Sequence, residues 1–297
     1  MSYPAPAAPA LTTAAFDLHG PDQPISPVII AVSHAGRDYG ADLLAAARVG
    51  PDVLRRLEDR YVDLLAHPLI DLGYTVLVAR APRAMIDLNR DEREIDPAMI
   101  AGMPRDTPLQ SSAKLRGGLG LLPRRLPGAA ELWQRPIAWA EAVRRIETIH
   151  RPYHAALEEQ MRRAWLAHGH AVLIDLHSMP PLPPVGAGAP APGVVLGDRF
   201  GRAASARLMS LADDVLSGHG VRVAQNHPYA GDHSVERHGR PARDRHAMQV
   251  EVDRSLYLDE ALERPGPGLA RTQAAIVSLV NAIASESPRA AYPMAAE

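Results

Sequence analysis

"HAVLIDLHSMPP", residues 170–181, predicts a buried β-strand that ends on polar side chains. The run up to Ile174 is apolar without alternation, which is typical of a strand covered on both faces. Asp175 and His177 follow it, and strand alternation would point both side chains to the same side of the sheet. The prolines that come next end the strand, and we expect them to form a stiff wall of a pocket. The stretch therefore predicts a central strand that carries an acid and a histidine to a functional site.

Strand and helix signals alternate along the rest of the chain. Short apolar or β-branched runs predict strands at 27–33, 74–80, 194–198, 221–226 and 247–253. Helical spacing of apolar residues predicts helices at 51–69, 135–167, 199–218 and 267–285. Apolar strands separated by helices predict an α/β fold with three αβα layers, in which helices cover both faces of an open, mostly parallel mixed sheet.

Composition along the chain predicts its organisation. Residues 1–24 begin with a Pro/Ala-rich stretch and are expected to form a flexible arm, followed by a single domain over 25–290. Within that domain, residues 81–133 are rich in Pro, Gly and Arg and are too long for a simple connection. Loops of this length are usually functional, so we predict that 81–133 borders the active site.

The bulk composition excludes several classes of protein. The 297 residues carry a formal net charge of -2, with 46% hydrophobic and 22% charged residues, as in ordinary globular enzymes. No basic stripe suggests nucleic acid as a partner, and no apolar run approaches the roughly 20 residues of a membrane span. The N-terminus lacks the features of a signal peptide, which favours a cytoplasmic protein. Because cysteine is absent, any metal must be held by His, Asp or Glu.

Polar side chains lie where the predicted strands end, and in open α/β sheets ligands bind beyond the carboxyl ends of the strands. These residues are His34, Arg83, Asp87, Asn89, Arg90, Asp175, His177 and Glu251. Two histidines and a carboxylate are a common ligand set for catalytic zinc. His34 and His177 are the predicted histidines, while the carboxylate could be Asp38, Asp59 or Asp63.

The other polar residues suggest roles in catalysis and substrate binding. Glu251 lies between two valines, where desolvation would raise its pKa and suit a general base. Arg83 and Arg90 could hold a substrate carboxylate. Each residue also has a structural interpretation, because loop histidines, turn-anchoring acids and ion-paired strand acids are common. Asp175 could anchor a turn or fix the tautomer of His177.

The remaining histidines fall into two groups. Those in or beside the predicted helices are interpreted as structural or exposed: His67, His150, His154, His168 and His170. Four others lie in or beside the loop after the strand at 221–226, and one of them is expected to contact substrate: His227, His233, His238 and His246. No phosphate-binding glycine motif is present, and without a GxSxG motif a serine hydrolase is a weak alternative.

Seven short motifs occur in order and together resemble the N-formylglutamate amidohydrolase family. They are "SHAG", "LEDRYVDLL", "PRAMIDLNR", "RPYHAAL", "IDLHSM", "NHPYAG" and "MQVEV". That family is similar in fold to the zinc carboxypeptidases, so the resemblance implies a phosphorylase/hydrolase-like, zinc-exopeptidase-like sheet. It also implies a zinc-dependent hydrolase that cleaves an N-acyl amide.

The resemblance implies roles for individual residues. His34, Asp59 and His177 would bind one Zn2+ or another divalent ion, which ranks Asp59 above Asp63, and Glu251 would be the general base. Arg83, Asn89 and Arg90 would bind the substrate, together with Tyr229 of "NHPYAG".

The implied reaction is the hydrolysis of N-formyl-L-glutamate to formate and L-glutamate, the last step of one histidine-degradation route. The expected partner is a small N-acylamino acid, and the expected assembly is a monomer or a small homo-oligomer. Two alternatives stay open. The same zinc site could act on another N-acylamino acid or a peptide, or the protein could bind a metabolite without catalysis.

Overall fold

A seven-stranded mixed sheet forms the centre of the computed structural model, which describes residues 14–126, 128, 131–184 and 190–286. The strands lie in the order β1-β3-β2-β6-β9-β7-β8. Their bounds in that order are Phe16–His19, Thr75–Ala79, Val28–Val32, Ala171–Met179, Arg245–Asp253, Val194–Gly197 and Val223–Gln225. β3, β2, β6 and β9 run parallel, whereas β1 pairs antiparallel with β3 and β7 antiparallel with β9. The prediction of a mostly parallel mixed sheet is confirmed.

The strand β6, which contains the opening sequence motif, lies in the middle of the sheet and is buried along its whole length. It pairs with β9 over nine residues, and this register places His177 beside Glu251 and Asp175 beside Gln249. Because alternate residues of a strand share a face, the register brings all four polar side chains to one side of the sheet.

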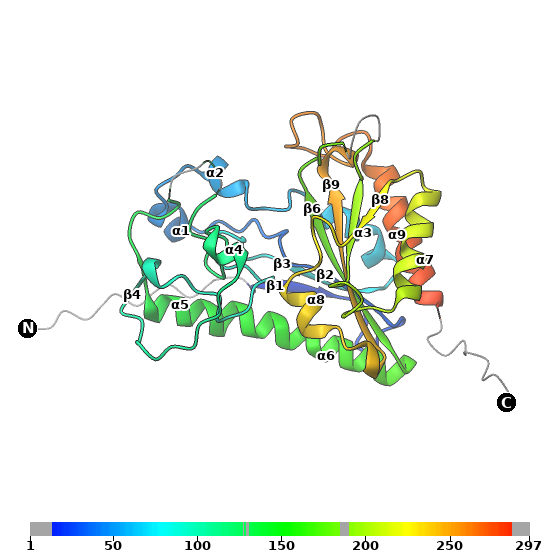
Figure 1. Ribbon diagram of the computed structural model, residues 1–297, viewed down its shortest axis with the longest axis horizontal. Helices are drawn as coiled ribbons and strands as arrows, with labels where there is room; N and C mark the ends of the chain where they lie inside the picture. The colour runs from blue at the N-terminus through cyan, green and yellow to red at the C-terminus, as the bar shows by residue number, and fades with distance from the viewer. Residues whose placement is uncertain (1–13, 127, 129–130, 185–189, 287–297) are drawn as a thin grey trace, which may run out of the picture.

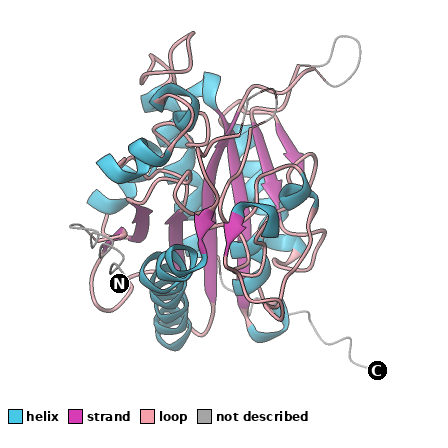
Figure 2. Cartoon of the chain, turned by 90° about the vertical axis from the view of Figure 1, so that its left-hand side faces the viewer, coloured by secondary structure: helices cyan, strands magenta, loops and turns pink. Residues whose placement is uncertain are grey.

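Helices cover both faces of the sheet (Figures 1 and 2). One hydrophobic core contains residues of α3 (Asp63–Asp71), α7 (Ala206–Gly218) and α9 (Leu269–Ser285). The other contains residues of α6 (Arg151–His168), α8 (His233–His238) and the segment 81–133. Neighbouring β6 residues divide between the two cores, Leu173 facing α6 and Ile174 facing the opposite helices. The structure thus has the predicted three layers.

The predicted helix 51–69 is wrong in its middle part. The chain instead forms α2 (Pro51–Arg55) and α3, separated by a turn in which Tyr61 has a left-handed φ of 55°. Within this turn the backbone N–H of Asp59 donates to the carbonyl of His34 at 3.1 Å. Asp59 therefore lies in an irregular connection, not on a helix, and is tied directly to the end of β2.

Other differences concern the ends of elements. The predicted helix 135–167 begins as β5 (Ile137–Ala138), α5 (Trp139–Arg145) and a π-helical turn (Ile146–His150) before α6. The predicted helix 199–218 starts only at Ala206, after positive φ angles at Arg199 and Phe200. Residues 16–19 of the predicted arm form β1, while residues 1–13 lie outside the described residues.

The segment 81–133 is largely irregular, as predicted. Its described residues, 81–126, 128 and 131–133, include as regular elements a 3-10 turn (Pro97–Met99), β4 (Ile100–Ala101), which pairs with β5, and α4 (Ala113–Arg116). The remaining helix and turns are α1 (Ala41–Ala46) and 3-10 turns at Pro241–Arg243 and Arg254–Leu256. Among the described residues, no helix has the length and apolar character needed to cross a membrane.

Candidate active site

A cavity of about 160 Å³ lies where the neighbouring strands β3, β2, β6 and β9 end. Five of its lining residues come from the segment 81–133, which was predicted to border the site: Arg83, Asn89, Lys114, Leu119 and Leu126. Met179 and Pro180, just after the last histidine of β6, form part of its wall. The position agrees with the rule that ligands bind beyond the carboxyl ends of parallel strands.

His34, Asp59 and His177 form a buried cluster in this cavity. Each offers a ring nitrogen or carboxylate oxygen, and these three atoms lie within 4.8 Å of one another. Asp59 Oδ2 lies 2.8 Å from His177 Nδ1 and 3.5 Å from His34 Nδ1. The two imidazole rings meet edge to face with their centres 4.6 Å apart. The structure thus brings together the three side chains predicted to hold the metal.

Two further carboxylates contact the histidines from behind. Asp87 accepts a hydrogen bond from His34 Nε2 at 2.7 Å, which leaves the lone pair of His34 on Nδ1. Asp175 Oδ2 lies 3.0 Å from His177 Nε2, although the contact lacks hydrogen-bond geometry. Both acids are completely buried. Carboxylates in this position orient histidines that bind metal ions.

The charges in the cluster fit a cation. Burial alone would lower the pKa of His177, but Asp175 and Asp59 outweigh it and raise that pKa well above the usual value. Burial would raise the pKa of Asp59, yet the two histidines lower it well below its usual range. His34 Nδ1 is buried without a hydrogen-bond partner. Buried anions that favour a positive charge at His177 also favour a bound cation, which would displace the His177 proton and use the free lone pair of His34 Nδ1.

Glu251 lies on β9 beside His177 and lines the same cavity. The pKa of Glu251 is raised to about 7, chiefly by burial; Asp59 and Asp232 also raise it, whereas His177 and Arg83 lower it. Its Oε1 accepts a hydrogen bond from Gln249 Nε2 at 2.8 Å, which fixes the side chain. A carboxyl group with this pKa can both accept and release a proton near neutral pH.

Four cationic side chains line the cavity: Arg56, Arg83, Lys114 and Arg254. Arg83 donates from Nε to Asp87 at 2.8 Å. Arg254 donates to Asp59 Oδ1 at 3.3 Å and to Ser178 Oγ at 3.1 Å. Of these four cations, only Arg83 was predicted from the sequence to line the site. Arg254 directly follows a strand end, so the strand-end argument could have identified it, whereas nothing in the sequence placed Arg56 or Lys114 in the site.

The other residues predicted to bind substrate divide between the cavity and its surroundings. Asn89 and Tyr229 line the cavity. Asn89 Nδ2 lies 3.1 Å from His177 Nε2, and the Lys114 ammonium lies 5.7 Å from the centre of the Tyr229 ring. Arg90 does not line the cavity: it is 98% buried behind it, because it pairs with Asp232 at 3.0 Å and donates to two backbone carbonyls.

The alternative carboxylates lie outside the cluster. Asp63 forms a two-pronged ion pair with Arg37 at 2.8 and 2.6 Å. Asp38 pairs with Arg80 at 3.0 Å near the surface. Among the three candidates, only Asp59 contacts both histidines, because the turn after α2 directs it toward the ends of β2 and β6.

The fold and the site together define an α/β enzyme of the hydrolase type, with a histidine–carboxylate centre at the carboxyl edge of a mixed sheet. A sequence model of the N-formylglutamate amidohydrolase family matches residues 26–258. The chain therefore belongs to the N-formylglutamate amidohydrolase family.

Individual relatives agree with this assignment. The chain is 30% identical to an N-formylglutamate deformylase of Pseudomonas putida over 79% of this chain and 82% of the relative. A crystal structure of an N-formylglutamate amidohydrolase from Ralstonia eutropha superposes with a TM-score of 0.83 and 35% identity, covering 91% of this chain and 98% of the other. A gene product from Agrobacterium tumefaciens has the same fold, with a TM-score of 0.55 and 18% identity over 92% and 96% of the two chains.

Proposed function

We propose that the protein hydrolyses the formamide bond of N-formyl-L-glutamate to give formate and L-glutamate with the aid of a divalent metal ion, most suitably zinc. The observation that carries the proposal is the buried His34–Asp59–His177 cluster beside Glu251, in a chain of this family. The reaction breaks the bond between the formyl carbon and nitrogen and forms a bond from that carbon to the oxygen of water.

The metal would be held by His34, Asp59 and His177, with Asp87 behind the first histidine and Asp175 behind the second. Bound there, zinc would supply Lewis-acid activation of water and of the formyl oxygen. Asp87 holds His34 in the tautomer whose Nδ1 can donate a lone pair. Asn89 contributes by steadying His177, which it contacts through its side-chain amide.

Glu251 is the proposed proton carrier. In its ionised form it takes a proton from the attacking water, and it then delivers that proton to the departing amine nitrogen of glutamate. Its pKa of about 7 supports both steps, because neither the charged nor the neutral form is strongly favoured near neutral pH. The hydrogen bond from Gln249 Nε2 restricts the rotation of the Glu251 carboxyl group.

The cations of the cavity suit a substrate with two carboxylates. Arg83 and Lys114 lie on the segment 81–133, and Arg254 approaches from the end of β9. Arginine can bind a carboxylate through two parallel hydrogen bonds, while lysine acts as a compact charge. The cavity therefore offers more than one cation to the α-carboxylate and the side-chain carboxylate of N-formylglutamate.

The test is a substrate panel with the purified protein, before and after treatment with a chelator. We expect release of formate from N-formylglutamate, loss of activity on chelation and recovery with added zinc. N-acetylglutamate and N-formylleucine should react more slowly, since they change the acyl group and remove the side-chain charge respectively. Activity that survives complete metal removal would disprove the metal-dependent mechanism.

Glu251→Gln separates proton transfer from metal binding. We expect the variant to retain its metal and to lose about 10²–10⁴-fold in kcat, because an amide cannot carry the proton. The matched control is Glu263→Gln, which removes an exposed glutamate whose pairing with Arg60 is loose at 3.9 Å. Wild-type turnover in Glu251→Gln would exclude Glu251 as the base.

A further inference from the structure

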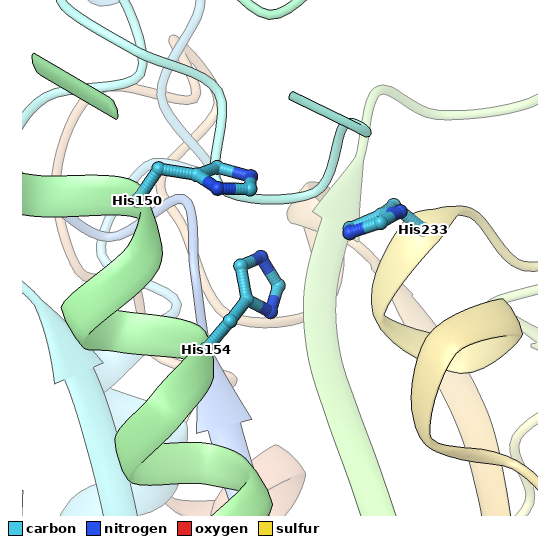
Figure 3. Close-up of side chains that lie close together, drawn as sticks. All are labelled: His150, His154 and His233. Carbon is cyan, nitrogen blue, oxygen red and sulfur yellow. The ribbon is translucent and has the colours of Figure 1, made fainter. Parts of the chain in front are cut away.

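A second group of histidines lies outside the candidate active site, where α6 meets α8. His150 ends the π-helical turn before α6, His154 follows one turn later, and His233 begins α8. Figure 3 shows the three imidazole rings converging from these two elements. One ring nitrogen from each lies within 4.8 Å of one from each of the others. Two histidines at i and i+4 share one helix face, an arrangement that metal sites on helices use.

The hydrogen bonds of this histidine cluster fix two of its tautomers. His150 Nε2 lies 2.8 Å from the carbonyl oxygen of Arg90, and His154 Nε2 lies 2.8 Å from that of Leu88. Because a carbonyl can only accept, each Nε2 carries the hydrogen and each Nδ1 carries a lone pair. Both Nδ1 atoms and His233 Nε2 are buried without a hydrogen-bond partner. Three buried nitrogens without a hydrogen-bond partner in one cluster are therefore free to bind a common ligand.

The charge state of the cluster also suits metal binding. Burial lowers the pKa of His150, and it lowers that of His154 well below the usual value, where the other histidines add to the effect. Burial lowers the pKa of His233 to about 3. All three rings are therefore neutral at pH 7, which is the form that binds metal ions.

We propose that His150, His154 and His233 form a second metal site, which binds a divalent transition metal ion of the zinc class independently of the His34–Asp59–His177 cluster. Three neutral imidazoles suit zinc, copper or nickel and do not suit magnesium or calcium, which prefer oxygen ligands. Nitrogens at tetrahedral positions around zinc lie about 3.4 Å apart, given bonds of about 2.0–2.1 Å.

The second site would position part of the candidate active site. Both backbone carbonyls that accept from the cluster flank Asn89, whose side chain contacts His177. Next to His233, the backbone N–H of Ser234 donates to Asn89 Oδ1 at 2.8 Å. A metal ion that links α6 to α8 would therefore fix the segment 88–90 from two sides. The role that follows from these contacts is structural: the ion would hold α6, α8 and the segment 88–90 together.

The test counts zinc in a variant that lacks the first site. His177→Asn protein is stripped with a chelator, exchanged into buffer with excess zinc chloride, desalted, and analysed for metal. We expect one equivalent per chain, and we expect zinc to raise the melting temperature. Adding His154→Asn or His233→Asn to this background should reduce zinc to below 0.1 equivalent, a loss of about tenfold or more. X-ray absorption of the single variant should show nitrogen neighbours at about 2.0 Å.

Two controls keep the result decisive. His246→Asn removes another buried histidine with an unpartnered Nδ1 that lies outside the cluster. Added to His177→Asn, it should leave one equivalent of zinc bound per chain. His233 is less buried than His154, so its variant serves if His154→Asn fails to fold. A folded His177→Asn protein that binds no zinc would overturn the proposal, as would an equivalent that persists after the cluster is altered. Either result concerns only the second site, because hydrolysis is tested separately in the wild-type protein.

Discussion

Asp87 illustrates how much a single buried carboxylate can organise. It accepts hydrogen bonds from His34 Nε2, the backbone N–H of Asn89 and Arg83 Nε. Burial would raise its pKa, but the neighbouring arginines and His34 lower it well below the usual range, so Asp87 is charged. The Asp87 side chain thus holds His34, Asn89 and Arg83 in place.

Asp87→Asn should weaken metal binding at the candidate active site by about 10–100-fold, because the orienting carboxylate behind His34 is lost. The measurement is zinc affinity by chelator competition in a His233→Asn background, so that the histidine cluster does not contribute. Asp38→Asn, which removes an exposed acid paired with Arg80, is the control. Unchanged zinc affinity in Asp87→Asn would show that His34 needs no support from this carboxylate.

Lys114→Met should impair recognition of the acidic side chain. A hydrogen bond between charged groups contributes about 1.5–3 kcal/mol, so we expect KM for N-formylglutamate to rise about 10–100-fold with little change in kcat. N-formylglutamine, which lacks the side-chain charge, should be affected much less. Arg116→Met on the same helix is the control, since Arg116 is exposed. An equal effect on both substrates would mean that Lys114 does not read the side-chain carboxylate.

From the residues alone, the candidate site could be predicted where a position follows from a strand end, whereas Asp59 was ranked first only through the family resemblance. His34, His177 and Glu251 directly follow or end apolar runs, and the structure brings them together. Arg90 stands in the same motif as Arg83, but its side chain points to Asp232 and not into the cavity. The motif does not show in which direction each arginine points. Lys114 comes from a long irregular segment, whose path depends on tertiary contacts.

Among the elements, the turn between α2 and α3 has the largest effect on the site. Apolar spacing over 51–69 suggested one helix, because the two short helices continue the same spacing. The break depends on a left-handed Tyr61 and on the bond from Asp59 N–H to the His34 carbonyl, both of which are tertiary features. Periodicity records which face is buried, not whether the backbone is continuous, so this turn could not be predicted.

The packing of α6 against α8 predicts a pH-dependent stability. The pKa of His233 is about 3 in the folded state, against about 6.5 when unfolded. The unfolded chain therefore binds an extra proton between these values, and stability falls as pH decreases below about 6.5. In metal-free protein, lowering the pH from 7 to 5 should reduce the free energy of unfolding by on the order of 1–2 kcal/mol, because His233 takes up a proton only in the unfolded chain.

The measurement compares urea unfolding of wild-type and His233→Asn protein at pH 7 and pH 5 in the presence of chelator. The variant should lose less stability on acidification. Taking the difference between the two proteins cancels the opposite contribution of His177, whose raised pKa favours the folded state in this range. His67→Asn, which removes an exposed histidine of α3, should keep the wild-type pH dependence. Parallel curves for wild type and His233→Asn would contradict the expectation.

In the molecule as a whole, the alternation of apolar strands and helices was enough to predict the three layers. Strands such as β2 and β6 are apolar on both faces because both faces are covered. The order of the strands and the antiparallel direction of β1 and β7 were not predictable in the same way. The order of the strands depends on which strand edges come together when the helices pack. A short apolar strand has the same pattern in either direction, so the pattern does not show whether it pairs parallel or antiparallel.

The two cores on opposite faces of β6 lead to the last prediction, that the described domain from β1 to α9 unfolds as one cooperative unit. Leu173 and Ile174 are adjacent, fully buried and assigned to different cores. Leu173→Ala and Ile174→Ala should each lower the free energy of unfolding by about 2–5 kcal/mol. Because β6 belongs to both cores, both variants should shift the same single transition in urea, followed by circular dichroism and tryptophan fluorescence. Leu166→Ala, at a position that is 60% exposed, should change stability by less than about 0.5 kcal/mol. Two separate transitions, with each variant moving only one, would show that the faces of the sheet belong to independently folding units.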